Sequence, residues 1–343
     1  MIKEVVKDIY TFPVTLPNNL LKALNVYVVK GENRIVVFDT GFNAEASKED
    51  LLNGLKALDV SIEEVEVILT HLHSDHVGLV NLFAGAGCKI YAGEVDGQLI
   101  NEMVTREYWD SLEALIPLYG MEEDELITDE NPGYKHRLER TIDYIELEIG
   151  EYFAVGDYCF EILDLSGHTP GHLGFYDKDK KILLSADTIL DPITPNITFW
   201  GFEYPDILNT YIETLYSLKD LEIDLALATH RKIIANPHGR IDELILHHDE
   251  RLQEILDAMD FGKKYTVREI STNISWRIRA DNWDEFPRAQ KWFAAGETMA
   301  HLHHLANTNC VKMDMGEGSL KFTKLEEEIV PFNKESDESV KSL

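Results

Sequence analysis

The run His71-Leu72-His73-Ser74-Asp75-His76 places three imidazoles and a carboxylate within six consecutive positions. It follows Val65-Glu66-Val67-Ile68-Leu69, a short apolar run typical of a buried strand. A loop that leaves such a strand can turn all four polar side chains toward one point. Imidazole and carboxylate groups are ligands for zinc, and they also suit iron or manganese. The stretch therefore predicts a metal site at the end of a strand.

Other candidate ligands lie far along the chain, each directly after a predicted strand. His168 stands in the run Ser166-Gly167-His168-Thr169-Pro170-Gly171-His172, and Asp187 and His230 each follow a later strand. Ligands that converge on a metal must come from a rigid scaffold, and strand ends supply one. His172, the second histidine of this run, is more typical of a structural residue. The pattern predicts sheets whose strand ends meet at one metal centre.

Strand and helix patterns alternate over the first 240 residues. Apolar runs predict strands at 26–29, 34–38, 65–69, 89–91, 158–163, 173–176, 182–184 and 225–228, and helical spacing marks 45–58 and 206–219. Residues 94–145 differ, because long amphipathic runs with a turn cluster at 129–133 predict a helical insertion. The fold class predicted is therefore α/β (α+β), with sheets covered by helices.

The chain turns helical from residue 240. Helices are predicted at 241–259, from 265 with Thr266 and Glu269 as a capping pair, and at 290–306. A hairpin is predicted at 310–325. Three helices and a hairpin are typical of a winged-helix-like domain. We therefore expect a catalytic domain at 1–239, a winged-helix-like domain at 240–333 and a loose tail at 334–343.

The composition indicates which classes of partner and which cellular compartment to expect. The formal net charge of −30 repels nucleic acid and acidic membranes on average, so a small-molecule substrate is favoured and nucleic acid is disfavoured. No run approaches the roughly 20 apolar residues that span a bilayer, and the N-terminus lacks the apolar run of a signal peptide. Three scattered cysteines make no disulfide framework. We expect a cytoplasmic protein without a membrane partner, and a homo-oligomer is compatible with the sequence.

The HxHxDH loop, with the later HTPGH, Asp187 and His230, resembles the metallo-β-lactamase superfamily over nearly the whole chain. The resemblance implies an αββα sandwich with a dinuclear site at one edge of its two sheets. It implies that Asp39, in Phe38-Asp39-Thr40-Gly41, orients a ligating histidine. The implied cofactors are two divalent ions, with zinc expected and iron or manganese as alternatives. The implied ligands are His71, His73 and His168 for one ion, Asp75, His76 and His230 for the other, and Asp187 as the bridge.

The resemblance also implies a mechanism. Two cations about 3.5–4 Å apart share a water and lower its pKa toward about 7, so a metal-bound hydroxide is the expected nucleophile. Asp75 and Asp187 are the expected catalytic carboxylates. The sequence holds no GxSxG, which excludes the usual serine-hydrolase arrangement. Residue 73 is His where flavodiiron relatives usually carry Glu. Asp187 separates the chain from true β-lactamases and is similar to the glyoxalase II-like thioesterases and the phosphodiesterase branches.

The C-terminal part carries a second resemblance. Residues 247–255 and Ala300-His301-Leu302 are similar to the winged-helix extension of one superfamily branch, which includes a mitochondrial endoribonuclease. His248 stands where that branch usually has Arg, and Leu252 where it has Glu, so ribonuclease activity should not be transferred freely. His247 and Arg231 are candidate substrate contacts.

Three functions follow from these features. The favoured one is a metal-dependent hydrolase of a small thioester or ester, with aromatic residues of 108–119 as a candidate lid. The second is a phosphodiesterase or endoribonuclease that grips phosphates through Arg277, Arg279, Arg288 and Lys291. The third is a winged-helix metal-sensing regulator, which the full ligand set argues against.

Overall fold

The structure is a computed structural model that describes residues 2–332, and the tail predicted at 334–343 lies outside them. Its first sheet has seven strands in chain order. The first four strands pair antiparallel, whereas β4 to β7 run parallel. The strands are β1 (Lys3–Val6), β2 (Ile9–Thr15), β3 (Ala23–Lys30), β4 (Ile35–Phe38), β5 (Val65–Ile68), β6 (Ile90–Ala92) and β7 (Ile145–Glu146).

The second sheet has the strand order β12-β11-β10-β9-β8. Only its β11 and β12 pair in parallel, and the other neighbours are antiparallel. A small third sheet, β13-β15-β14, lies near the C-terminal end of the described chain. These strands are β8 (Tyr152–Val155), β9 (Tyr158–Asp164), β10 (Leu173–Asp177), β11 (Ile182–Ala186), β12 (Leu225–Ala228), β13 (Lys264–Tyr265), β14 (Val311–Met315) and β15 (Leu320–Lys324).

Three apolar cores show why the two large sheets pack as they do. The core between the sheets contains Phe38 from the first and Phe160 and Phe175 from the second. Alternating side chains of the first sheet point the other way, to a core with α1 (Glu45–Ala57), α3 (Val80–Gly85) and the insertion. The outer face of the second sheet packs against α8 (Ile207–Lys219) and the C-terminal helices. The layers are helix, sheet, sheet and helix, which confirms the predicted αββα sandwich.

The insertion contains α4 (Glu94–Glu102), α5 (Arg106–Glu113), α6 (Leu115–Tyr119) and α7 (Pro132–Lys135). Trp109 belongs to the core of the first sheet, and Tyr119 to the core of the second. Asp124, also in the insertion, accepts hydrogen bonds from Arg268, Trp283 and Lys291. The aromatic residues proposed as a lid therefore pack the insertion against both helical layers and fix it in place.

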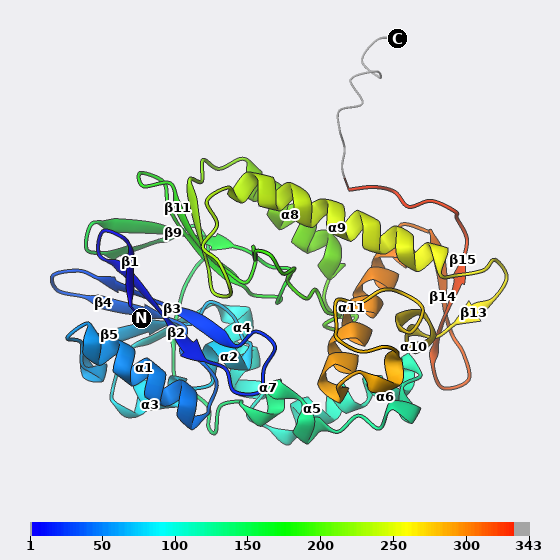
Figure 1. The fold of residues 1–343 in the computed structure, drawn as a ribbon, viewed down its shortest axis with the longest axis horizontal. Coiled ribbons are helices and arrows are strands. Elements are labelled where there is room, and N and C mark those ends of the chain that lie inside the picture. The colour runs from blue at the N-terminus through cyan, green and yellow to red at the C-terminus, as the bar shows by residue number, and fades with distance from the viewer. Residues whose placement is uncertain (1, 333–343) are drawn as a thin grey trace, which may run out of the picture.

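The predicted C-terminal helices and hairpin are present as α9 (Pro237–Asp257), α10 (Val267–Ser271), α11 (Arg288–Asn307), β14 and β15. Thr266 and Glu269 form the predicted capping box of α10. The expected boundary at 239–240 falls inside α9, which runs from the sandwich to the C-terminal helices along one side of the molecule (Figure 1). Leu244 and Leu256 of α9 share one core with Leu215 of α8. The C-terminal part is therefore packed into the sandwich, and its winged-helix class stays a prediction.

The described residues, 2–332, include no helix that is long and apolar enough to cross a membrane.

Candidate metal centre

The strand ends of both sheets bring all seven predicted ligands together. The loop after β5 enters α2 (Ser74–Val77), a single helical turn that points Asp75 and His76 inward. His168, Asp187 and His230 follow β9, β11 and β12. Ligand atoms lie within 4.8 Å of one another in three groups, namely His71 with His73 and His168, His71 with His76 and Asp187, and Asp75 with His76 and His230.

Three of the histidine rings are each held by a hydrogen bond at Nδ1. Nδ1 of His76 lies 2.8 Å from Asp39 Oδ2, that of His168 lies 2.9 Å from the Asn196 carbonyl, and that of His230 lies 3.0 Å from the Ala23 carbonyl. Each partner is an acceptor, so each Nδ1 carries a proton, and in the neutral ring the lone pair that can bind a metal is on Nε2.

The three Nε2 atoms are buried and have no hydrogen-bond partner within residues 2–332. All three surround one oxygen, since Asp187 Oδ2 lies 3.5 Å from Nε2 of His76, 3.5 Å from that of His230 and 3.6 Å from that of His168. A buried polar atom without a hydrogen bond costs stability, and cations held among these atoms would satisfy them. The donor set therefore fits a divalent metal.

Asp187 lies at the centre of this arrangement. Its Oδ1 accepts a hydrogen bond from the Thr229 hydroxyl, and its backbone N–H donates to Nε2 of His172 at 3.3 Å. These contacts leave Oδ2 facing the rings. The His172 ring stacks on the His71 ring with 4.7 Å between centroids, so His172 packs against a candidate ligand.

Asp39 lies beside His76, one of the candidate ligands. Its Oδ2 also accepts from the Thr70 hydroxyl at 2.8 Å, and its Oδ1 accepts from the Thr70 N–H at 2.9 Å. Asp39 adopts a φ of 63°, and Ala186 and Arg231, which adjoin Asp187 and His230, have φ values of 43° and 63°. Left-handed backbone at non-glycine residues is costly, and it gathers where a fold holds functional side chains in place.

Charges within the cluster oppose the effects of burial. Burial by itself raises the pKa of Asp75 and Asp187, but the neighbouring His76 and His230 outweigh it, so the pKa of Asp75 falls to about 2 and that of Asp187 falls well below its usual value. Burial lowers the pKa of His230, but Asp187 and Asp75 outweigh it and raise that pKa to about 10. Carboxylates and cationic rings thus balance one another in the protein alone, and divalent cations would take over the positive charge.

The site meets solvent beside His73 and Asp75. The side chain of Asp75 is 12% exposed, whereas those of His76 and His230 are fully buried. The ring of Trp200 lies 6.0 Å from that of His73, and its buried Nε1 has no hydrogen-bond partner in the described chain. The indole of Trp200 therefore lies at the His73 side of the cluster.

Asp96 in α4 is a site residue that the sequence interpretation missed. It is 2% exposed, and it accepts hydrogen bonds from the Leu72 N–H at 2.9 Å, the Thr169 hydroxyl at 2.6 Å and the Gly171 N–H at 2.7 Å. Asp96 therefore joins the HxHxDH loop to the HTPGH loop. An acid in the first turn of a helix is common, so the sequence offers no signal that marks it.

The two candidate substrate contacts lie outside the ligand groups. The Arg231 guanidinium donates to the Leu20 carbonyl at 2.7 Å. His247 lies half-buried on α9, with its ring 5.1 Å from that of His248. Substrate contact by either residue stays a prediction.

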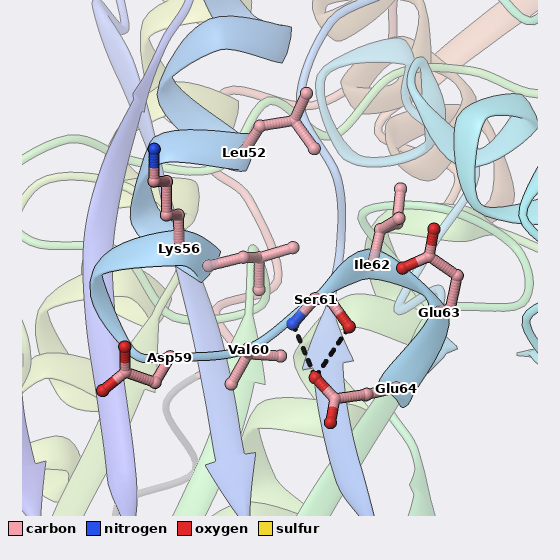
Figure 2. Close-up of a pocket in the computed structure, with 9 residues that line it drawn as sticks. Leu52, Lys56, Asp59, Val60, Ser61, Ile62, Glu63 and Glu64 are labelled. Carbon is pink, nitrogen blue, oxygen red and sulfur yellow. Dashed lines mark hydrogen bonds between the residues drawn. The ribbon is translucent and has the colours of Figure 1, made fainter.

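Figure 2 shows a surface hollow at the C-terminal end of α1, lined by residues that include Leu52, Lys56 and Glu64. Ser61 and Glu64 form a capping box across it. The candidate ligands lie at the opposite ends of the strands, since β5 begins at Val65, beside the hollow, and ends at Ile68, before His71. The hollow is therefore separate from the metal centre.

The fold and this cluster define an αββα protein with a candidate metal centre, and comparison with known proteins identifies the family. Residues 22–230 match the metallo-β-lactamase superfamily, which is more than half of the 343 residues. The chain belongs to the metallo-β-lactamase superfamily. Members of this superfamily typically bind divalent metals, and the groups described above could hold them.

A solved structure extends the likeness to the C-terminal part. The chain superposes on a metallo-β-lactamase family protein from Thermus thermophilus with a TM-score of 0.81 and 26% identity, covering 94% of this chain and 100% of that one. The fold therefore recurs nearly from end to end in another member of the family.

Two relatives carry names that state an activity. A Homo sapiens acyl-coenzyme A thioesterase is 23% identical over 176 residues, which are 49% of this chain and 58% of that protein. A Haemophilus influenzae hydroxyacylglutathione hydrolase is 26% identical over 194 residues, which are 55% of this chain and 77% of that protein. The prediction that the chain is a hydrolase of this superfamily is confirmed.

Proposed function

We propose that the protein is a dinuclear metal hydrolase of small acyl thioesters or esters. In this proposal His71, His73 and His168 bind one ion, Asp75, His76 and His230 bind the second, and Asp187 bridges them. The observation that carries it is the convergence on one oxygen of Asp187 of three buried Nε2 atoms that accept or donate no hydrogen bond within residues 2–332. Zinc is the expected metal because imidazole and carboxylate ligands suit it, and iron or manganese would fit the same donors.

Bound divalent ions supply a Lewis acid that activates water and polarises the carbonyl under attack. The residues of the chain set where this happens. Asp39, Asn196 and Ala23 fix the three rings, so that their Nε2 atoms keep one orientation. Asp75 lies at the exposed side of the cluster, where it would take up the proton released by the attacking water and return it to the departing thiolate or alkoxide, and the indole of Trp200 lies beside the ring of His73.

Two features favour a thioester. The relatives noted above are named for acyl-coenzyme A and hydroxyacylglutathione, which are both acyl thioesters. The wall of the site beside His73 is the apolar face of Trp200, which packs against the cores of both sheets. An acyl chain would find an apolar surface there, next to the metal ligands.

The nucleic-acid alternative loses support from the structure. Lys291 is buried and donates to Asp124 at 2.9 Å, so its ammonium is engaged inside the protein. Arg288 donates to Glu130 at 2.9 Å. Only Arg277 and Arg279 remain of the four cations expected to grip phosphates, on a chain with a net charge of −30.

The test combines metal analysis with a substrate panel. Protein purified without chelator or added metal is expected to contain about two metal ions per chain, and to hydrolyse an acyl-coenzyme A or acylglutathione thioester faster than bis(p-nitrophenyl) phosphate or single-stranded RNA. The variant His230→Ala is expected to lose one ion and the activity. His238→Ala, which removes a histidine of α9 bonded to the Leu221 carbonyl, is the matched control and should keep both.

A chain that binds no metal after reconstitution would refute the ligand assignment. Two bound ions with preferential cleavage of the diester or of RNA would keep the metal centre and overturn the thioester assignment.

A further inference from the structure

The loop between β11 and α8 rests on helix α11. The Asn196 side chain donates from Nδ2 to Glu297 Oε2 at 2.9 Å, and the Phe199 N–H donates to the Gly296 carbonyl at 3.1 Å. A Cβ at position 296 would lie 2.1 Å from the Thr198 hydroxyl oxygen, so a larger residue there would force the Thr198 side chain to move. The loop and the helix are therefore in close, directed contact.

The same loop holds a candidate metal ligand. The carbonyl oxygen of Asn196 lies 2.9 Å from Nδ1 of His168, and the opposite ring atom, Nε2, faces Asp187 at 3.6 Å. Asn196 thus touches the histidine through its main chain and Glu297 through its side chain. The side-chain contacts of Asn196 help to hold its backbone, and a shift of that backbone would move the carbonyl that sets the orientation of the His168 ring.

Glu297 is itself held firmly. It is 8% exposed, and its Oε1 lies 3.6 Å from Nε of Arg251 on α9. One turn earlier on α11, the Phe293 carbonyl also receives the Asn196 amide, at 3.3 Å. Two acceptors on one rigid helix therefore fix the side chain of Asn196.

We infer that Glu297 is a positioning residue for the metal centre, acting through Asn196 on His168. Partners that orient a ligating histidine contribute to metal affinity, because they hold the lone pair in the direction of the ion. The inference rests on the proposed function, in which His168 is a ligand. Glu297 lies outside residues 22–230, the part that matches the superfamily, so the C-terminal part of this chain takes a share in metal binding.

The experiment measures metal affinity of the full chain by competition with a chromophoric chelator, and records the visible spectrum of the cobalt(II) form. Glu297→Ala is expected to weaken the binding of one ion about 10- to 100-fold and to shift the cobalt bands. Glu297→Gln keeps an acceptor for the Asn196 amide and is expected to restore nearly the wild-type affinity and spectrum.

The matched control is Asp206→Ala. Asp206 also ties α11 to the sandwich, since its Oδ2 lies 2.8 Å from Nδ1 of His304, but its partner lies two helical turns beyond Glu297. A purely structural role for such contacts predicts that Asp206→Ala and Glu297→Ala weaken metal binding alike. The inference predicts that Asp206→Ala leaves the affinity and the cobalt spectrum unchanged.

A donor–acceptor exchange keeps the test decisive if Glu297→Ala does not fold. Asn196→Asp alone places two carboxylates face to face and should weaken metal binding. Asn196→Asp combined with Glu297→Gln restores a hydrogen bond of reversed direction and should recover the affinity. Wild-type affinity in folded Glu297→Ala, failure of Glu297→Gln to rescue, or no recovery in the combined variant overturns the inference while leaving the proposed function intact. A wild-type chain that binds no ion overturns both.

Discussion

Nδ1 of His76 lies 2.8 Å from Oδ2 of Asp39, and both side chains are fully buried. The carboxylate also accepts two hydrogen bonds from Thr70, which begins the loop that carries four of the candidate ligands. Asp39 therefore fixes the tautomer and direction of His76 and the start of the loop together. This couples the position of one ring to the backbone of the HxHxDH run.

Replacing Asp39 should lower the affinity of the protein for metal ions. Asp39→Asn keeps the size of the side chain but replaces one carboxylate oxygen with an NH2 group. The side chain then has one acceptor fewer for the His76 and Thr70 donors. The expected result is a loss of about 10- to 100-fold in metal affinity, measured by chelator competition. Glu66→Gln is the control. Glu66 lies on β5 and pairs with Arg34, away from the candidate ligands. Equal affinities in Asp39→Asn and wild type would contradict the role given to Asp39.

Trp200 should act on substrate binding and leave the metals in place. Trp200→Ala removes a large apolar surface beside His73, and we expect KM for an acyl thioester to rise about tenfold with little change in kcat. Trp200→Phe should fall between the two. Elemental analysis should find the wild-type metal content in each variant. Trp276→Ala, which removes an indole packed under Arg251, is the control and should keep the wild-type KM. A change in kcat alone would argue against substrate contact by Trp200.

The ligands could be predicted from the sequence because each follows a strand and carries a side chain that suits a metal. The resemblance added Asp39. Asp96, Asn196 and Glu297 could not be predicted in the same way, because each acts through contacts with distant segments, such as the 101 positions between Asn196 and Glu297. An isolated acid on a helix is usually solvated, and nothing in its neighbours distinguishes a buried one.

For the helical insertion too, the sequence predicts the extent of the segment but not the contacts that hold it. Its extent, 94–145, follows from amphipathic spacing, and the structure places α4 to α7 within it. Its packing depends on Asp124, which looks like one more acid in the run Glu122-Glu123-Asp124-Glu125. The partners of Asp124 lie at 268, 283 and 291, so only the folded chain distinguishes it from its neighbours.

Removing Asp124 should therefore destabilise the protein strongly. Asp124→Ala leaves the ammonium of Lys291, whose side chain is 8% exposed, without its buried counter-charge. We expect a loss of about 3–5 kcal/mol in the free energy of unfolding, measured with urea. Arg288→Ala is the matched control, since Arg288 joins the insertion to α11 through Glu130 at the surface, and its loss should cost less than about 1 kcal/mol. Similar losses in the two variants would show that Asp124 is not the main link.

The last prediction concerns pH and the buried pair His248 and His301. Nδ1 of His301 lies 2.8 Å from the Glu297 carbonyl and carries a proton, so its Nε2 accepts from Nδ1 of His248 at 3.0 Å. Burial lowers the pKa of His301 to about 3 and that of His248 well below its usual value. Below pH about 6.5 the unfolded chain binds protons at these positions that the folded chain does not, so stability falls as pH falls from about 6.5 toward about 3.

His301→Gln keeps an acceptor for His248 and removes one of these titrating groups. Below pH 6 the free energy of unfolding of wild type falls as the pH falls. In the variant this fall should be smaller by about 1.4 kcal/mol for each pH unit. Urea unfolding at pH 7, 6 and 5, with both proteins in the same metal state, measures the difference. Leu305→Ala on the same helix serves as the control, because a cavity in the core lowers stability by about the same amount at every pH. A His301→Gln variant with the pH slope of wild type would show that the pair takes up protons in the folded state, and would rule out a buried neutral pair.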